Sequence, residues 1–210
     1  DMIPAEQCIE AHVRAHEATQ TPTCFEGAAF NLKTLDWPLK FSGMTPQIGK
    51  VLRKKKPLGW YYFLTGNVSI PTHLFNHVNG FSIDFTGYGW EDLELGYRLH
   101  QLKIPLMYLP ESINYHYHII HTVSELSRYE EKGRSACIFL SKHPELKWFL
   151  GFHPITMAIA KRISLTSCWY HWATQYAHSG RFQWQKRLGS WFLTEYHYRI
   201  GALGDGQTVL

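Results

Sequence analysis

The sequence predicts an α/β domain followed by a helical appendage. The chain of 210 residues is 45% hydrophobic and 15% aromatic, which is enough apolar material for a sizeable core and excludes a disordered protein. Up to residue 121, short apolar runs typical of strands alternate with stretches of helical spacing, and beyond that point helical spacing dominates.

Positive charge is concentrated at the C-terminal end. The whole chain carries a formal charge of +4, whereas residues 147–210, with seven basic and two acidic side chains, carry +5. Aromatic side chains are interleaved with these basic residues, and no apolar run reaches the length of about 18 residues that a membrane span requires. This composition suits either packing on the main domain or a peripheral contact with an anionic surface.

The four cysteines form no CxxC pair and are widely spaced. A chain of this size does not need disulfide bonds to fold, so reduced thiols in a cytoplasmic protein are expected.

The first part of the chain predicts a helix, a strand and a long connection. Pro4 and the i, i+4 pair Ile9 and Val13 predict a helix over about 4–18. A strand is expected at 28–32, followed by an irregular, proline-rich segment up to 58. Its basic run 50–56 suits a solvated loop, with a phosphate site as the alternative.

The middle of the chain alternates strand and helix signals. Residues 60–64 predict a buried strand, and Gly66 with Asn67 predicts a turn. A short helix at 72–78 should end at Asn79 and Gly80. Further on, two strands (104–109 and 113–117) and two helices (123–132 and 135–142) are expected, separated at 110–112 and at Gly133.

An acidic pair begins the most regular helix of the sequence, predicted from Trp90 to Leu102. Asp92, Leu95, Leu99 and Leu102 lie on one stripe of that helix, so a core-facing stripe places Asp92 at its inward-facing start. The simpler alternative is that the two acids complement the helix dipole.

Histidines cluster at the end of the second of these strands. His116 and His118, two residues apart on a strand, point the same way and can reach one metal ion, and His121 follows. An HxHxxH cluster of a metal-dependent hydrolase is one alternative interpretation, and hydrogen-bonded structural histidines are another.

Several short motifs together resemble a known enzyme class. They are Thr65-Gly66-Asn67-Val68-Ser69, Asn79-Gly80-Phe81, Gly89-Trp90-Glu91-Asp92-Leu93-Glu94-Leu95, His116, Gly133-Arg134-Ser135-Ala136 and His143-Pro144-Glu145-Leu146. This pattern resembles the C-terminal half of inverting glycosyltransferases of the GT-A fold, family-two or galactosyltransferase-like. The resemblance implies a GT-A-like α/β fold truncated at the N-terminus, with residues 1–146 as the acceptor-side half of the catalytic domain and 147–210 as a helical, basic and aromatic tail.

The resemblance also implies a divalent cation, Mn²⁺ or Mg²⁺, which stabilises the departing nucleotide diphosphate. Asp1 looks like the last aspartate of the Asp-x-Asp motif that holds this cation. His116 occupies the place of the histidine ligand, with His118 as the alternative.

On the acceptor side, the resemblance implies catalysis by Asp92 as general base on the acceptor hydroxyl, with inversion in one displacement. Glu91 would bind acceptor hydroxyls, Gly66 and Asn67 would line the sugar pocket, and Trp90 would offer a flat face to a sugar ring.

Two departures from the family pattern concern donor recognition: Ser82 stands where an acidic residue is frequent, and Thr72 where arginine is frequent. The half that binds the nucleotide base precedes Asp1 in such enzymes, so weak or no transfer by this chain alone is expected.

The expected partners are a nucleotide-sugar donor, a glycan or lipid-linked acceptor and a membrane surface contacted through residues 147–210, with no nucleic acid. The expected location is the cytoplasm, at the inner face of the membrane, and the expected process is polysaccharide biosynthesis. The non-enzymatic alternative is a membrane-peripheral, anion-binding module.

Overall fold

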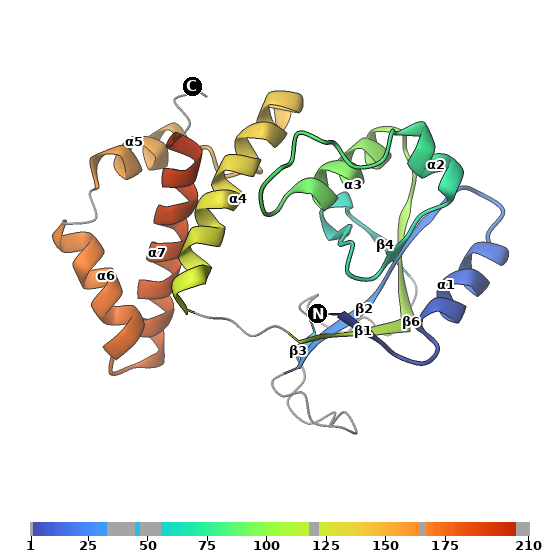
Figure 1. The fold of residues 1–210 in the computed structure, drawn as a ribbon, viewed down its shortest axis with the longest axis horizontal. Helices are drawn as coiled ribbons and strands as arrows, with labels where there is room; N and C mark the ends of the chain where they lie inside the picture. The colour runs from blue at the N-terminus through green and yellow to red at the C-terminus, as the bar shows by residue number, and fades with distance from the viewer. Residues whose placement is uncertain (1, 33–44, 47–55, 118–121, 164–166, 205–210) are drawn as a thin grey trace. The chain divides into compact units, whose positions relative to one another are not determined.

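The computed structural model describes residues 2–32, 45–46, 56–117, 122–163 and 167–204 (Figure 1). The chain has a mixed α/β fold with C-terminal helices, and it forms two compact units. The first comprises Asp1–Ser82 and Glu91–Ile119, and the second comprises Ile83–Trp90 and Ile120–Leu210. The predicted division into 1–146 and 147–210 stays a prediction. The two units follow a different division of the chain.

A mixed sheet is the centre of the first unit. Its strand order is β1 (Met2–Pro4), β6 (Leu106–Tyr117), β2 (Cys24–Leu32) and β3 (Thr45–Pro46), with β2 and β6 parallel and the outer strands antiparallel to them. Two short strands complete it, β4 (Pro57–Leu58) on β6 and β5 (Val68–Ser69) on β2.

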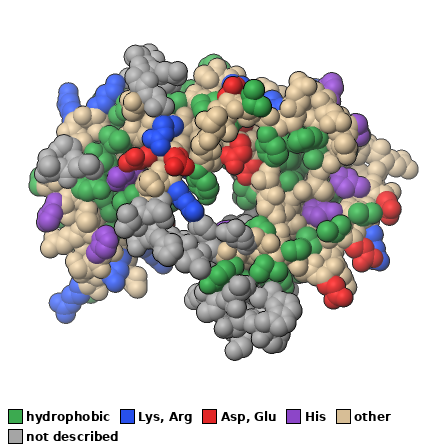
Figure 2. All heavy atoms as spheres, viewed as in Figure 1, with side chains coloured by type: hydrophobic (Ala, Val, Ile, Leu, Met, Phe, Trp, Pro, Cys, Tyr) green, Lys and Arg blue, Asp and Glu red, His purple; other side chains and the backbone are tan. Residues whose placement is uncertain are grey.

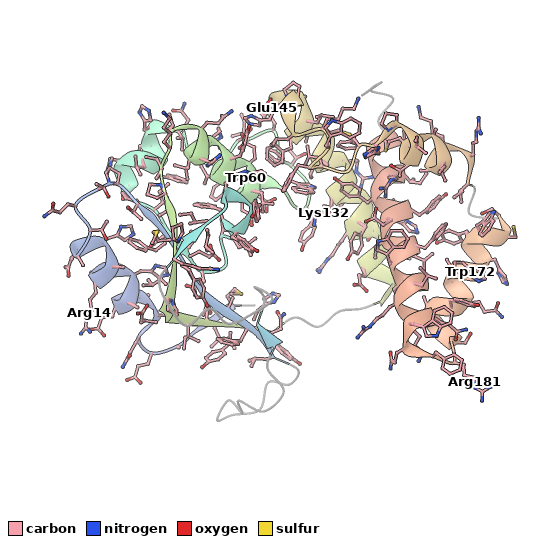
Figure 3. The ribbon with its side chains drawn as sticks, turned by 180° about the vertical axis from the view of Figure 1, so that it is seen from behind. Arg14, Trp60, Lys132, Glu145, Trp172 and Arg181 are labelled. Carbon is pink, nitrogen blue, oxygen red and sulfur yellow. The ribbon has the colours of Figure 1, made fainter. Side chains whose placement is uncertain are left out.

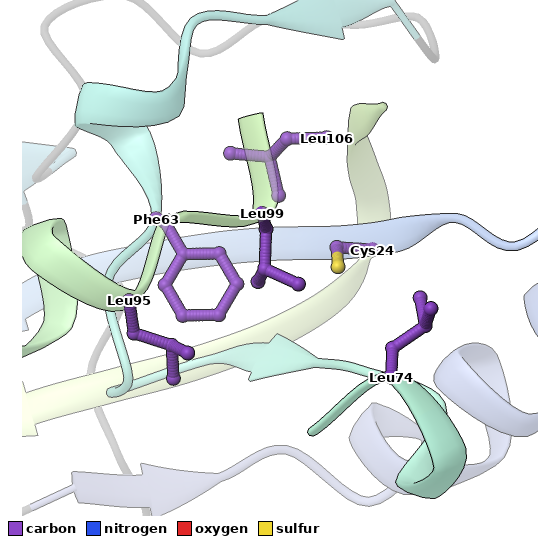
Figure 4. Close-up of a cluster of buried hydrophobic side chains, with 6 residues drawn as sticks. All are labelled: Cys24, Phe63, Leu74, Leu95, Leu99 and Leu106. Carbon is purple, nitrogen blue, oxygen red and sulfur yellow. The ribbon is translucent and has the colours of Figure 1, made fainter. Parts of the chain in front are cut away.

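Both faces of this sheet are covered, because successive residues of a strand point to opposite sides. On β2, Phe25 packs with Ala15 of α1 (Cys8–Glu17). Its neighbour Cys24 belongs to a cluster with Phe63, Leu74, Leu95, Leu99 and Leu106 (Figure 4). That cluster joins the sheet to α2 (Thr72–His77) and α3 (Glu91–Gln101), so the first unit consists of three layers.

A wide irregularity interrupts the pairing of β6 with β2. Gly27 pairs with Leu109 and Ala28 with Ile113, so that the three residues 110–112 have no counterpart on β2. Asn67 is buried there and donates to the carbonyl oxygens of Ala28 and Ser112 at 3.0 and 3.1 Å. A Cβ at residue 27 would lie 2.2 Å from the Asn67 amide nitrogen, so glycine is required beside it.

The second unit is helical: α4 (Thr122–Lys142), α5 (Pro154–Arg162), α6 (Cys168–Ser179) and α7 (Gln183–Leu203), with the 3-10 turn η2 (Pro144–Leu146). The other three helices all pack on α7. His197 of α7 bonds Glu130 of α4 at 2.6 Å and Tyr170 of α6 at 3.0 Å. None of the helices in the described part of the chain is both long and apolar enough to cross a membrane.

The predicted helices at 72–78 and 90–102 are confirmed, and the predicted strand 28–32 is part of β2. The first helix is shorter than predicted, because Pro4 belongs to β1. Its apolar pair Ile9 and Val13 is exposed, at 71% and 49%.

Three other element predictions were wrong. Residues 60–62 form the 3-10 helix η1 (Trp60–Tyr62) instead of a strand, and only Phe63 of this aromatic run is fully buried. The two predicted strands are one, β6, because residues 110–112 bulge without ending the pairing. The two predicted helices are one, α4, because Gly133 serves close packing: a Cβ there would lie 1.9 Å from the Tyr198 carbonyl oxygen of α7.

Candidate functional site

Two carboxyl groups of the first unit are held by adjacent backbone amides. The N–H of Leu64 donates to Glu26 Oε2 of β2 at 3.0 Å, and the N–H of Thr65 donates to Asp92 of α3. The Asp92 carboxylate also accepts from the N–H of Leu93, the next residue of α3, at 2.8 Å. The segment 64–65 therefore brings a strand acid and a helix acid to one place.

The start of α3 can approach this segment because Gly96 has no side chain. A Cβ at residue 96 would lie 2.5 Å from Phe63 Cβ and 2.9 Å from the Trp60 carbonyl oxygen. Trp60, labelled in Figure 3, belongs to η1, which is followed by Phe63 and then by the two amides. The helix, the 3-10 turn and the amide pair thus form one close-packed arrangement.

The pKa of Asp92 is raised from 3.8 to about 6. Burial is the larger cause, and the neighbouring negative charge of Glu91 is the second. The backbone amides of Leu93, Thr65 and Asp92 itself act in the opposite direction. The start of a helix favours the ionised form of a carboxyl group, but burial has the larger effect on the pKa of Asp92. A carboxylate with a pKa near 6 is ionised at neutral pH and accepts a proton readily, which are the properties of a general base.

Glu26 is the more deeply buried member of the pair, with 1% of its surface exposed. Burial raises the pKa of Glu26 well above its usual range, the Leu64 amide lowers it, and the Asp92 charge raises it. Its neutral form is therefore favoured beside an ionised Asp92.

Glu91 has a buried carboxylate oxygen for which the described residues supply no hydrogen-bond donor. Oε2 of Glu91 is out of contact with solvent, and no donor among the described residues reaches it. A buried acceptor without a donor is costly, and such atoms in native proteins call for an explanation such as a ligand. A ligand hydroxyl is the kind of group that satisfies this oxygen.

The helix is fixed in place by a buried ion pair one turn further along. Arg98 makes a bidentate contact with Glu94, through bonds of 2.9 and 2.8 Å, and Glu94 is 1% exposed. The same guanidinium donates to the carbonyl oxygens of Val78 and Gly80, which end α2. Positive φ angles at Asn79 and Gly80 turn these carbonyls toward it.

Gly66 and Asn67, the predicted sugar-pocket residues, differ in their surroundings. Gly66 is exposed, lies beside Met2 and accepts from the Asn114 side chain at 2.7 Å. The Asn67 amide is already bonded to two carbonyls, and its oxygen accepts from His12 at 3.1 Å. Asn67 thus holds the β6 bulge together, and Gly66 is the better placed of the two to meet a ligand.

Trp90 belongs to the second unit and is described within it. Its indole N–H donates to the Lys132 carbonyl at 3.0 Å, and the Lys132 ammonium lies 5.0 Å from the ring centroid. The ring lines a cavity of about 220 Å³ together with Phe149, Tyr198 and neighbouring residues. The φ of Trp90 is +77°, a strained value for a tryptophan, at the residue where the chain enters α3.

Of the predicted metal ligands, only His116 lies within the described residues; Asp1, His118 and also His121 lie outside them. His116 stands opposite Met2 in the pairing of β6 with β1. Met2 directly follows Asp1 in the sequence. Its Nδ1 contacts the Asn31 oxygen at 3.0 Å; because that oxygen only accepts, the ring lone pair is on Nε2, as in metal-binding histidines. No group of three potential metal ligands occurs among the residues that the structure describes.

A model of the family described as "N-terminal domain of galactosyltransferase" matches residues 47–122, which include the acidic pair Glu91 and Asp92 of α3 and the turns before it. This part of the chain is similar to that galactosyltransferase family. The match confirms the resemblance to a glycosyltransferase fragment, while the assignment to the C-terminal half of a catalytic fold stays a prediction.

The chain is also similar to two validoxylamine A glucosyltransferases, from Streptomyces hygroscopicus subsp. jinggangensis (strain 5008) and subsp. limoneus. Each is 55% identical over 53 residues, which are 25% of this chain. The matched part spans only 13% and 12% of the two relatives. No solved structure matches the chain significantly.

Sequence reasoning missed Glu26 as a member of the site. The signal was present, since Glu26 is a lone acid in the otherwise apolar run Cys24-Phe25-Glu26-Gly27-Ala28-Ala29. An acidic residue in a strand buried on both faces is rare without a partner or a function. Its neighbour in space, Asp92, is far away in the sequence and was not predictable from spacing.

Proposed function

We propose that the protein containing this chain is a glycosyltransferase that moves a sugar from a nucleotide-diphosphate donor to a hydroxyl of a glycan or lipid-linked acceptor, with inversion. The galactosyltransferase-family match over 47–122 supports the class of reaction. The single observation that carries the assignment of the base is the raised pKa of the partly buried Asp92, about 6, within that match.

In this reaction the acceptor oxygen attacks the anomeric carbon as the bond from that carbon to the diphosphate oxygen breaks. The acceptor proton passes to the Asp92 carboxylate, which is ionised at neutral pH. Asp92 is held for this task by the amides of Thr65 and Leu93, so that its carboxylate does not need to reorganise.

Glu91 is the proposed acceptor-binding residue. Its buried, unbonded Oε2 offers an acceptor hydroxyl a strong hydrogen bond, because a carboxylate in a poorly solvated place gains most from a donor. The exposed Gly66 lies one residue from the Thr65 amide that holds Asp92, and it is the proposed sugar-pocket residue at this place.

The family resemblance implies a divalent cation, and His116, with Asp1 as the second protein ligand, is the proposed holder. The Asn31 contact fits this role because it orients the imidazole. When bound, such a cation stabilises the charge that develops on the diphosphate; oxygen and imidazole ligands suit Mn²⁺ or Mg²⁺.

The test uses the full-length protein and the variants Asp92→Asn and Glu17→Gln, the second being an exposed acid at the end of α1. Nucleotide-sugar donors are screened for transfer, and donor binding is measured by calorimetry. We expect Asp92→Asn to lower the transfer rate by at least about a thousandfold, with donor affinity unchanged, because it removes the base and no donor contact. Retained turnover in this variant would remove Asp92 from its proposed role.

A further inference from the structure

Two helices of the second unit carry apolar stripes on their exposed faces. On α7, Trp184, Leu188 and Trp191 follow at i, i+4 and i+7, and the two indoles are 59% and 60% exposed. On α5, Ile155 and Ile159 lie at i and i+4 and are 71% and 52% exposed. These five residues are called the α5–α7 patch below.

The two stripes belong to one surface because a groove joins them. Ile159 of α5 and Trp191 of α7 line the same groove of about 170 Å³, whose other walls are mainly apolar. Large side chains left in water on adjacent helices are costly unless something covers them.

The edge of the α5–α7 patch is basic. Arg162 lies three residues after Ile159 and Arg187 three residues after Trp184, so each arginine continues an exposed stripe. Both arginines are exposed, and Figure 2 shows Lys and Arg side chains projecting from the outer edge of this unit. The one acid that lines the groove, Glu195, is paired with Arg199.

We infer that the α5–α7 patch is a membrane-docking surface that inserts its aromatic and aliphatic side chains into the interfacial region of an anionic bilayer. Indole rings favour the boundary between lipid headgroups and acyl chains, and arginines at the edge pair with lipid phosphates. This inference goes beyond the proposed transfer reaction and does not depend on it.

The charge pattern favours a bilayer over a second copy of the chain. A two-fold dimer through this patch would place the same basic edges against each other, which repels, whereas an anionic surface neutralises them.

The test is flotation of the purified 210-residue chain with vesicles of phosphatidylcholine, with and without phosphatidylglycerol, at low and high salt. The variants are Trp184→Ser/Trp191→Ser, Arg162→Gln/Arg187→Gln and the control Ile83→Ser, which removes a 91% exposed apolar side chain outside the patch. Far-UV circular dichroism confirms that each variant is folded, and size-exclusion chromatography with light scattering reports self-association.

We expect the natural chain to bind the phosphatidylglycerol vesicles, with weaker binding at high salt and a blue shift of tryptophan fluorescence. The double tryptophan variant should bind at least about tenfold more weakly, because two large aromatic side chains no longer enter the interface. The double arginine variant should lose the preference for anionic lipid, and Ile83→Ser should bind normally. Binding that is equal in the double tryptophan variant, no vesicle binding by the natural chain, or a dimer abolished by the tryptophan changes would each overturn the proposal.

Discussion

Replacing Asp92 by asparagine is expected to stabilise the first compact unit at neutral pH while it removes the proposed base. A carboxyl group whose pKa is raised from 3.8 to about 6 on folding opposes folding, at pH values above both, by about 3 kcal/mol. Asparagine has no charge to desolvate, but it keeps one oxygen for the amide of Leu93 or Thr65. The net gain in the free energy of unfolding should therefore be about 1–3 kcal/mol.

The gain should depend on pH with a definite sign. Above the folded pKa of about 6, Asp92 is ionised in the folded and the unfolded chain, and the folded state bears the whole penalty. Below the unfolded value of 3.8 the group is protonated in both states and there is no penalty. The advantage of the variant should accordingly fade as the pH drops through this window.

The assay is urea unfolding of the natural chain and the variant at about pH 7.5 and about pH 4, where linkage predicts different values. Amide hydrogen exchange in peptides from 91–101 reports the unit that contains Asp92. The difference between the two proteins isolates this one carboxyl, since all other titrating groups are shared. A variant that is no more stable at neutral pH, or whose advantage is the same at both pH values, would refute the reasoning that burial dominates this site.

Three further predictions concern the surroundings of this helix. Arg98→Ala should lower the free energy of unfolding by about 3–5 kcal/mol in urea titrations, because it leaves the buried Glu94 carboxylate without its cation. Asn67→Ala should cost about 2–4 kcal/mol in the same measurement, because two buried carbonyls lose their donor. Glu91→Gln should lower the pKa of Asp92 and shift the acid limb of the transfer rate to lower pH, because it removes a negative charge that raises that pKa.

Matched controls exist for the two stability predictions. Arg14 and Glu10 form an i, i+4 pair on α1 that is 74% and 54% exposed, so Arg14→Ala should change stability by less than about 0.5 kcal/mol. Asn76 is exposed on α2, and Asn76→Ala should be similarly neutral. Equal losses in control and test variants would show that burial is not the cause. For Glu91→Gln, an acid limb that stays in place would exclude the expected coupling to Asp92.

Local rules predicted the elements whose signals lie within one turn of the chain. The α2 helix ends at Asn79 and Gly80, as the sequence indicates, because both residues adopt the positive φ that ends helices. The α3 helix was predictable from its leucine stripe: Leu95 and Leu99 are 1% and 2% exposed, whereas Leu102, just beyond its end, is 45% exposed.

Local rules failed where a distant partner changed the meaning of a residue. Gly133 suggests a helix break, yet it lies within α4, because the Tyr198 backbone of α7 occupies the space of a side chain. Pro110 to Ser112 suggest a turn between two strands, yet pairing with β2 continues on both sides of them, and Asn67 bonds the Ser112 carbonyl. Such contacts span more than 40 residues and leave no periodicity in the sequence.

By itself, the sequence determined that an acidic pair begins a helix directly behind a glycine-rich turn. Its motifs also identified the class of enzymes that the chain resembles. Only the tertiary structure decided the state of the acids: the raised pKa of Asp92, the neighbouring Glu26 on consecutive amides and the unbonded oxygen of Glu91. The physical reason is that helix spacing is a local property of the chain, whereas desolvation and coupling between charges depend on what the folded chain packs around a group.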